Sequence, residues 1–290
     1  MTAVKITLLA LAALLLAGAA LGTWVHSRDK AQMRAVWAAL EDAGAADPPR
    51  YDPAMVADLP EIAQRYFSRA IAPGTPLHRS VRLQTEGTFI THGNEMPMTA
   101  RQILAPPGHG FVWRAGVGRG LTRFAGSDGY HAPAGGPMES WTKFRLHGLI
   151  PFVRIGGGED HAGAAATRAM LESVWVPASL LPQSGAEWVQ TGPDSAEIRF
   201  AGLQGIEPMQ LTLDAAGNPA EVQALRWSDA DPEREYRLQP FGGRVLKTER
   251  IGGFVIPIRV EMGNHYGTPD FAPFFRALLS RPHHASGVLS

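Results

Sequence analysis

The pattern of apolar and polar positions divides the chain into a helical N-terminal part and a strand-rich remainder. Ile6 to Val25 consists almost entirely of apolar residues and has no charge, and its length matches the ~20 residues that span a hydrocarbon core. Ser27 to Ala43 then carries charged residues on one side and apolar residues at helical spacing on the other. We therefore expect an N-terminal apolar helix over residues 1–26, followed by a helical stalk and linker over residues 27–58.

The apolar segment has two interpretations. As a cleaved signal peptide, it has Lys5 before the apolar run and an A-x-A-like site at Ala17-Gly18-Ala19. As an uncleaved transmembrane anchor, it has Trp24 at the membrane interface and Arg28 and Lys30 beyond it. The run continues past the possible cleavage site, which favours the anchor. Basic residues on both sides leave its orientation undetermined.

The periodicity changes to two at Val81. Val81, Leu83 and Phe89 face one way, whereas Arg82 and Gln84 face the other. A short helix beginning at Glu61 precedes this point. Regular spacing and Gly/Pro turns predict meandering antiparallel strands. The predicted strands are Val81–Phe89, Met96–Leu104, Gly110–Ala115, Leu121–Ala125, Glu187–Gln190, Glu197–Ala201, Met209–Asp214, Ala220–Ser228, Glu235–Gln239, Val245–Ile251 and Ile256–Met262.

One segment among the strands has helical spacing, Thr167 to Pro182. Met170, Val174 and Ala178 recur every four residues, and Pro177 predicts a break near Val176 followed by a restart. A short apolar helix among strands buries its face best against a sheet. We therefore expect an α+β domain over residues 59–280, in which a large, curved, mainly antiparallel sheet packs on a central helix, 167–182.

Three segments are less regular. Gly135 to Gly163 contains several aromatic and aliphatic residues, so we expect part of it to be helical or to form a flap over the sheet. Phe271 to Leu279 is interpreted as a last short helix. Arg281 to Ser290 is predicted to be a flexible tail.

Composition narrows the possible functions. The formal net charge is zero, which does not indicate a general attraction to nucleic acid or acidic lipid. There is no cysteine, which excludes disulfides, thiolate metal sites, a lipid-modified cysteine and cysteine nucleophiles.

No catalytic, metal or cofactor site stands out from the sequence. Glu159-Asp160-His161 contains possible metal ligands, but adjacent residues do not converge on one ion in regular structure, so a solvated loop is favoured. Asp128, His131 and Ser173 are the residue types of a hydrolytic triad without the G-x-S-x-G elbow that would support one. An enzyme is therefore less favoured than a binding module.

Four residues are candidates for contacting a ligand. Arg168 and Glu172 lie one helical turn apart, as an i, i+4 ion pair or as a polar pair at the rim of a cavity. Trp113 and Trp175 belong either to a filled core or to the wall of an apolar pocket. The first alternative is favoured for both pairs, and the second makes Trp113, Arg168, Glu172 and Trp175 ligand-binding residues.

Several short segments, taken in order, resemble a family of bacterial membrane-associated proteins of unknown function. These segments are Leu59-Pro60, Met96 to Gln102, Phe111 to Ala115, Asp128-Gly129-Tyr130, Arg168 to Pro177 with Leu180-Leu181-Pro182, and Gly253 to Pro257. The turns near Gly217 and Gly253 are distantly similar to those of periplasmic lipoprotein carriers of the LolA/LolB type. That resemblance implies an incomplete antiparallel barrel wrapped around helices, with acyl chains bound inside. The chain departs from it in the expected anchor and in residues 135–163, which would fill the cavity.

The first functional hypothesis is a membrane-anchored, non-catalytic module that binds a lipid or another apolar ligand in the bacterial cell envelope. The resemblance implies an inner-membrane location with the soluble domain in the periplasm. The alternative is an envelope assembly subunit with a filled core and an unidentified protein partner, and an uncharacterised hydrolase comes third. No nucleic acid partner is expected. An interior cavity of at least ~300 Å³ would favour the first hypothesis.

Overall fold

The computed structural model describes residues 2–42, 47–106, 108–133, 136–231, 233–280 and 283–284. The beginning of the predicted linker (residues 44–46) and most of the predicted tail (281–282 and 285–290) lie outside these residues.

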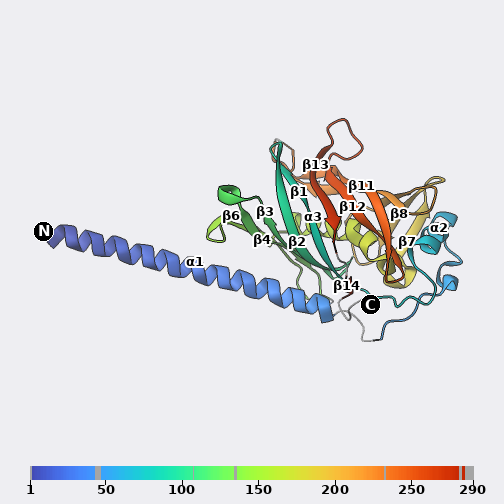
Figure 1. Cartoon of the computed structure of the whole chain (residues 1–290), viewed down its shortest axis with the longest axis horizontal. Helices are drawn as coiled ribbons and strands as arrows, with labels where there is room; N and C mark the ends of the chain where they lie inside the picture. The colour runs from blue at the N-terminus through green and yellow to red at the C-terminus, as the bar shows by residue number, and fades with distance from the viewer. Residues whose placement is uncertain are drawn as a thin grey trace.

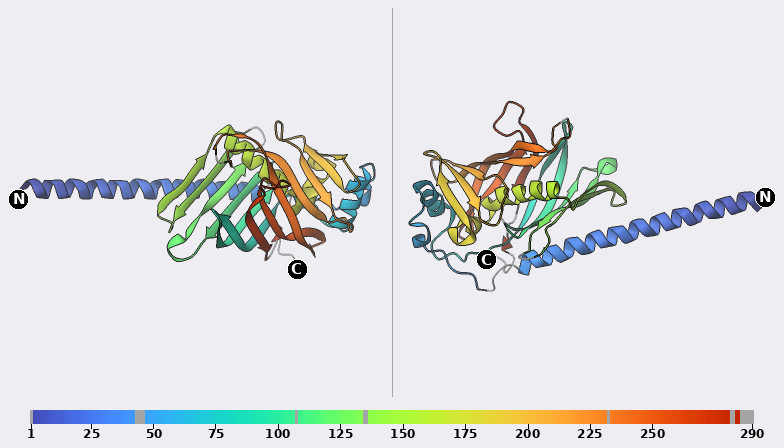
Figure 2. Two further views of the ribbon diagram at one scale, coloured as in Figure 1. Left: turned by 90° about the horizontal axis from the view of Figure 1, so that it is seen from above. Right: turned by 180° about the vertical axis from the view of Figure 1, so that it is seen from behind.

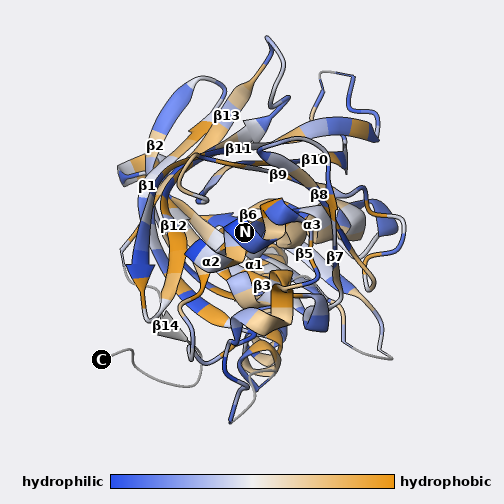
Figure 3. Ribbon diagram, turned by 90° about the vertical axis from the view of Figure 1, so that its right-hand side faces the viewer, coloured by the Kyte–Doolittle hydropathy of each residue, from blue (hydrophilic) through white to orange (hydrophobic). Residues whose placement is uncertain are grey.

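One antiparallel sheet forms the body of the molecule. Thirteen strands follow the order β6-β5-β4-β3-β2-β1-β13-β12-β11-β10-β9-β8-β7, and β14 pairs with β1. The sheet curves into an incomplete barrel with helices on its concave side (Figures 2 and 3). The strands are β1 Val81–Thr91, β2 Asn94–Ala105, β3 Gly110–Val117, β4 Phe124–His131, β5 Glu139–Leu146, β6 Ile150–Gly156, β7 Ala186–Gln190, β8 Ser195–Phe200, β9 Met209–Leu213, β10 Pro219–Ser228, β11 Arg237–Ile251, β12 Phe254–Asn264, β13 Ala272–Leu279 and β14 His283–His284. The expected α+β architecture is confirmed.

The N-terminal helix α1, Thr2–Asp42, is continuous and extends far beyond the sheet (Figure 1). Its apolar N-terminal part packs against no other part of the described chain and is long and apolar enough to cross a membrane. Its C-terminal turns pack on the outer face of the sheet, where Met33, Val36 and Leu40 form a second apolar cluster with Ile103 and Val112. This packing ties the apolar helix firmly to β2 and β3.

The helical segment inside the barrel begins earlier than predicted. Helix α3 runs from Glu159 to Leu171, and 3₁₀ turns η3 Glu172–Trp175, η4 Pro177–Leu180 and η5 Pro182–Ser184 follow it. The break at Val176 and the restart at Pro177 are confirmed, because Pro177 lacks the N–H that a continuous helix requires. The prediction of a solvated loop at Glu159 is wrong, because Glu159-Asp160-His161 forms the first turn of α3. The helix dipole favours acidic residues in a first turn.

The aromatic region, described over residues 136–163, continues the sheet instead of forming a flap over it, and its last five residues, Glu159 to Gly163, begin helix α3, so the expected helical part is confirmed. Its main part is the hairpin of β5 and β6, with Leu146 opposite Ile150. A three-residue connection, His147 to Leu149, joins the strands; His147 and Gly148 have positive φ, and the Leu149 N–H donates to the Leu146 carbonyl at 3.0 Å. Such a turn matches the twist of an antiparallel pair, which explains why the chain pairs here.

The last short helix predicted at Phe271 to Leu279 is also wrong. This segment is strand β13, which lies between β1 and β12, with Phe275 opposite Phe89 and Leu278 opposite Arg259. The strand joins the two halves of the sheet, and such pairing between residues far apart in sequence overrides local helical spacing. His283 and His284 then pair with β1 as β14, within the segment predicted to be a flexible tail. The two strands predicted within residues 235–251 form one strand, β11.

Short helical elements close one end of the barrel. The predicted helix at Glu61 is α2, Glu61–Ala70, and the turn η1, Pro53–Val56, precedes it. The turn η2, Gly120–Thr122, lies elsewhere, between β3 and β4. Tyr66 and Phe67 of α2 pack on Trp188 of β7, with ring centroids 5.5 Å apart in both pairs. This end is therefore filled with aromatic side chains.

Candidate functional site

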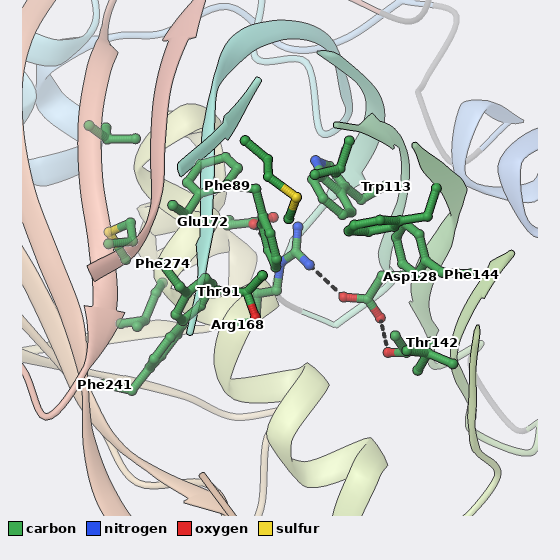
Figure 4. A pocket seen from close by; sticks show the side chains of 18 of the residues that line it. Phe89, Thr91, Trp113, Asp128, Thr142, Phe144, Arg168, Glu172, Phe241 and Phe274 are labelled. Atoms are coloured by element: carbon green, nitrogen blue, oxygen red, sulfur yellow. Dashed lines mark hydrogen bonds and ion pairs between the residues drawn. The ribbon is translucent and has the colours of Figure 1, made fainter. Parts of the chain in front are cut away.

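A cavity of about 780 Å³ lies between the concave face of the sheet and the segment α3–η3. Figure 4 shows side chains from the sheet and from α3 converging on it. The apolar lining includes Phe89, Met96, Trp113, Val117, Phe124, Phe144, Phe152, Leu171, Val174, Trp175, Val222, Phe241, Val245, Val260, Met262, Phe274 and Phe275. The polar lining includes Thr91, His92, Thr122, Asp128, Thr142, Arg168, Glu172 and Arg226. The interior is open despite the aromatic residues of the β5–β6 hairpin.

Aromatic rings make up a large part of the cavity wall. Phe124 of β4 lies edge-on to Phe144 of β5 at 5.8 Å and to Phe89 of β1 at 6.4 Å between centroids. Phe274 of β13 stacks on Phe241 of β11 at 6.1 Å. These contacts fix the rings to one another along the sheet, so the wall is held in place without filling the interior.

A partly buried charge cluster closes one side of the cavity. The guanidinium of Arg168 donates to Asp128 at 2.5 Å (Figure 4). It also donates to Glu172 at 2.8 Å. The amide of Gln102 also donates to Glu172 at 2.5 Å, and the hydroxyl of Thr142 donates to Asp128 at 2.9 Å. Burial works against the charged form of Arg168, but Glu172 and Asp128 outweigh it and raise its pKa. The i, i+4 ion pair is therefore present and is extended by Asp128.

The guanidinium of Arg168 is also packed between apolar groups. It lies 4.4 Å from the ring centroid of Phe111 and 5.2 Å from that of Trp113. With both carboxylates and two rings in contact, Arg168 has a fixed position. This arrangement indicates a structural cluster in the cavity wall instead of a free group at the rim.

Arg226 of β10 is a second guanidinium that lines the cavity. It lies 4.5 Å from the ring centroid of Phe241, and its Nε is buried without a hydrogen-bond partner. Among the residues that the structure describes, no carboxylate comes within ion-pair distance of it. Burial lowers the pKa of Arg226 to about 10, although Asp128 opposes this shift from further away and Arg168 adds to it. Arg226 thus remains charged at neutral pH and carries donors that no protein group uses.

The possible metal ligands diverge. The carboxylate of Asp160 accepts a hydrogen bond from the Trp227 indole at 2.6 Å, whereas Nε2 of His161 lies 3.0 Å from the Thr142 hydroxyl. Within the described part of the chain, no three His, Asp or Glu side chains are grouped so that they could hold a metal. The hydroxyl of Ser173 is buried without a hydrogen-bond partner, so it is not activated by a histidine in this structure.

All four predicted ligand-binding residues, Trp113, Arg168, Glu172 and Trp175, line the cavity. The indole N–H of Trp175 donates a hydrogen bond to the carbonyl of Pro257 at 2.9 Å, so the side chain presents only its apolar ring surface to the cavity. The structure brings the two tryptophans and the ion pair to one site from β3 and from the segment α3–η3.

Sequence reasoning missed Arg226 and the role of Asp128, although a signal for each exists. Arg226 follows Val222 and Ala224 at a spacing of two on β10, and both of these residues are buried. Asp128 alternates in the same way between Phe124 and Tyr130 on β4. A charged residue on the inward face of an alternating strand indicates a buried polar site, because successive side chains point to opposite faces.

Comparisons with known proteins give a distant similarity to carriers of the LolA/LolB type. The outer-membrane lipoprotein LolB of Shewanella amazonensis is 26% identical over 134 residues, which are 42% of this chain and 58% of LolB. The chain therefore spans less than two thirds of that relative.

Solved structures with a similar chain path include a DUF1329 family protein from Desulfovibrio piger and a LolA superfamily protein from Nitrosomonas europaea. The first has 11% identity and a TM-score of 0.43, covering 77% of this chain and 90% of that one. The second has 10% identity and a TM-score of 0.34, covering 76% and 90%. The sequence pattern of the family of unknown function DUF6544 matches residues 49–277, and the chain belongs to this family.

Proposed function

We propose that the protein is a membrane-anchored, non-catalytic module that binds a lipid or a similar amphiphile in the bacterial cell envelope. The observation that carries the proposal is the apolar cavity of about 780 Å³. This volume lies within the ~300–1,000 Å³ typical of small-molecule sites, and it exceeds the size expected of a packing defect. A filled core, which the alternative hypothesis requires, is not favoured by such a volume.

The energetics of the cavity suit an alkyl chain. Burying one methylene group contributes about 0.8 kcal/mol, so ten methylenes would contribute about 8 kcal/mol before the cost of association. The rings of Trp113 and Trp175 form part of the wall that the chain would contact. We expect these two residues to contribute to affinity through their apolar area.

We place the polar end of the proposed ligand at Arg226. Arg168 and Glu172 are bonded to each other and to neighbouring groups, so they shape the wall and offer few free donors. Arg226 has a free guanidinium in an apolar setting, where a carboxylate or phosphate would supply the missing hydrogen-bond acceptors. The preferred ligand is therefore an anionic amphiphile, such as a fatty acid or a lysophospholipid.

Native mass spectrometry of the full chain in detergent tests the cavity. The wild type should retain about one lipid per chain, and Val245→Phe should lose it, because Val245 lines the cavity and a phenyl ring would occupy part of it. Val189→Phe, on the exposed edge strand β7, is the matched control and should retain the lipid. Arg226→Met should favour neutral over anionic lipids. Absence of lipid from the wild type, with no uptake of added oleate, would refute the proposal.

The anchor and the location are part of the same proposal. The exposed apolar surface of α1 supports a helix that spans the membrane, and the similarity to an outer-membrane lipoprotein supports a place in the envelope. We place the anchor in the inner membrane and the sheet on the periplasmic side. The mature protein should keep its N-terminus and resist carbonate extraction; a soluble form beginning near Ala20 would refute the anchor.

The alternative, an envelope assembly subunit, has one observation in its favour. The edge strand β6 exposes Ile150, Phe152 and Ile155, and an edge strand can pair with another chain. Photo-crosslinking from position 155 in intact cells distinguishes the two functions. A protein adduct at this position together with an empty cavity would favour the assembly subunit.

A further inference from the structure

The outer face of the sheet carries a second concave site, beside α1 and separate from the ligand cavity. A groove of about 670 Å³ lies between the middle part of α1, residues 26–33, and strands β1 to β5. Its basic lining residues are Lys30, Arg101, Arg114, Arg123, Lys143 and Arg145, and its acidic ones are Asp29 and Glu86. The groove therefore concentrates an excess of four positive charges in a chain whose formal net charge is zero.

One of the two acidic residues is already shared among several cations. Asp29 of α1 lies 3.0 Å from Lys143, 3.8 Å from Arg145 and 2.5 Å from Arg154. These ion pairs fasten α1 to β5 and β6. Because the single negative charge of Asp29 is already shared by three cations, it does not neutralise the other basic side chains of the groove.

The other basic side chains have no carboxylate partner. Lys30, Arg101, Arg114 and Arg123 are exposed, and no ion pair to any of them occurs within the described ranges of the chain. Arg101 of β2 lies directly opposite Arg114 of β3 in the antiparallel register. Like charges at opposed positions are destabilising, because their Cβ atoms are only about 5 Å apart. An anion bound between the two guanidinium groups would remove this repulsion.

The position of the groove identifies the kind of anion. Its wall on α1 begins at His26, one residue after the apolar run that ends at Val25. Asp29 is only about 6 Å beyond Val25 along the helix axis, at 1.5 Å per residue. Trp24 lies under the guanidinium of Arg28 at 5.0 Å, an arrangement suited to the membrane–water interface. If α1 spans the bilayer, the groove lies at the level of the lipid head groups.

We propose that this outer groove binds the phosphate of an anionic phospholipid from the bilayer that holds α1, with Arg101 and Arg114 as its principal donors. Guanidinium groups offer planar pairs of donors that match phosphate oxygens. Basic side chains next to a membrane helix attract anionic lipid through the same charge complementarity. The inference rests on the proposed anchor and is independent of the ligand in the cavity. Its consequence is that the sheet would be held in a fixed orientation against the membrane surface.

The test compares lipid selectivity of matched variants. The full chain carrying Val245→Phe, which occupies the cavity, is mixed in dodecyl maltoside with equal amounts of dioleoylphosphatidylglycerol and dioleoylphosphatidylcholine. Native mass spectrometry then gives the ratio of the two lipids bound outside the cavity. Arg101→Gln/Arg114→Gln should reduce the preference for phosphatidylglycerol about 25-fold, at about fivefold for each basic side chain near an anionic surface. The thermal midpoint should stay the same or rise, because a repulsion is removed.

A second pair of opposed basic residues provides the control. Lys247 of β11 lies opposite Arg259 of β12, further along the sheet from α1. Lys247→Gln/Arg259→Gln removes the same charge and should leave the lipid ratio unchanged. An equal loss in both double variants would overturn the proposal, because it would show a general charge effect.

Two further outcomes separate this inference from its alternatives. Millimolar glycerol 1-phosphate should not displace the lipid; complete displacement would reveal a site for soluble phosphates and overturn the membrane assignment. If Val245→Phe empties the cavity while the preference for phosphatidylglycerol that depends on Arg101 and Arg114 persists, the groove binds lipid independently of the cavity. If lipid remains in the cavity and Arg101→Gln/Arg114→Gln changes nothing, the groove proposal fails and the cavity proposal survives.

Discussion

Replacing Arg168 with alanine should destabilise the domain far more than the loss of an ordinary helix ion pair. An exposed i, i+4 pair contributes about 0.3–0.5 kcal/mol. Arg168, however, bridges Asp128 and Glu172, whose side chains are only 18% and 11% exposed. The variant would leave two carboxylates in the cavity wall without their cation, a situation that costs about 3–5 kcal/mol when one partner of a buried pair is removed.

Two features of the site modify this magnitude. Thr142 still donates to Asp128 and Gln102 still donates to Glu172, so each carboxylate keeps one hydrogen bond and the cost moves toward the lower end. Loss of the contacts between the guanidinium and the rings of Phe111 and Trp113 acts in the opposite direction, by about 1 kcal/mol. We therefore expect a loss of about 3–4 kcal/mol in the free energy of unfolding.

The assay is urea unfolding of the full chain in detergent, followed by the fluorescence of its seven tryptophans. Arg199→Ala is the matched control, because Arg199 pairs with Glu197 on the surface and is 58% exposed; it should cost less than about 0.5 kcal/mol. The variant Arg168→Met/Asp128→Asn/Glu172→Gln should recover at least half of the loss, since it leaves no unpaired charge. A loss below about 1 kcal/mol for Arg168→Ala would refute the buried cluster.

Three further predictions concern other parts of the fold. Trp175→Ala should cost about 3–5 kcal/mol in urea unfolding, because it truncates a buried ring whose N–H donates to a β12 carbonyl; a loss below about 1 kcal/mol would contradict its buried position. Burial lowers the pKa of His161 from 6.5, so the neutral side chain contributes stability above pH 6.5, and this contribution is lost as pH falls through the folded-state pKa. The thermal midpoint of the wild type should therefore fall more steeply with acid than that of His161→Gln. Parallel curves for the two proteins would contradict this assignment. Gly87→Ala should lower the thermal midpoint strongly, because a methyl group on β1 would overlap the Arg276 carbonyl of β13. In Gly116→Ala the methyl group meets only the Thr99 hydroxyl, at 3.9 Å, and should change stability by less than about 1 kcal/mol.

The sequence by itself determined the class of the fold and much of its element order. Alternation in two from Val81 to Phe89 identifies a strand with one buried face, because side chains of a strand point alternately to its two faces. Pro177 fixes a break in the helical segment, because its ring removes a backbone donor. These properties are local, so they can be inferred without knowing where the rest of the chain lies.

Only the tertiary structure decided how the two halves of the sheet are joined. The segment at Phe271 to Leu279 is a strand because β1 and β12 offer it unpaired edges, and no local property of its residues shows this. In the same way, His147 and Gly148 form a hairpin turn because the flanking strands pair across it. The distinction between helix and strand in such segments depends on partners that are distant in sequence.

Among the charged residues of the site, local spacing predicts one contact and only the tertiary structure shows the others. Spacing on the helix brings Arg168 and Glu172 together, but the third member, Asp128, comes from a strand 40 residues away, and Arg226 from another strand. The open interior is a property of the curved sheet and cannot be inferred from the aromatic content, because the same rings would fill a flatter one. A net charge of zero likewise conceals the basic groove, since the register of β2 and β3 places Arg101 beside Arg114. Local periodicity thus fixes which face of its strand or helix each side chain occupies. Only the pairing and curvature of the sheet decide which side chains from distant segments lie together.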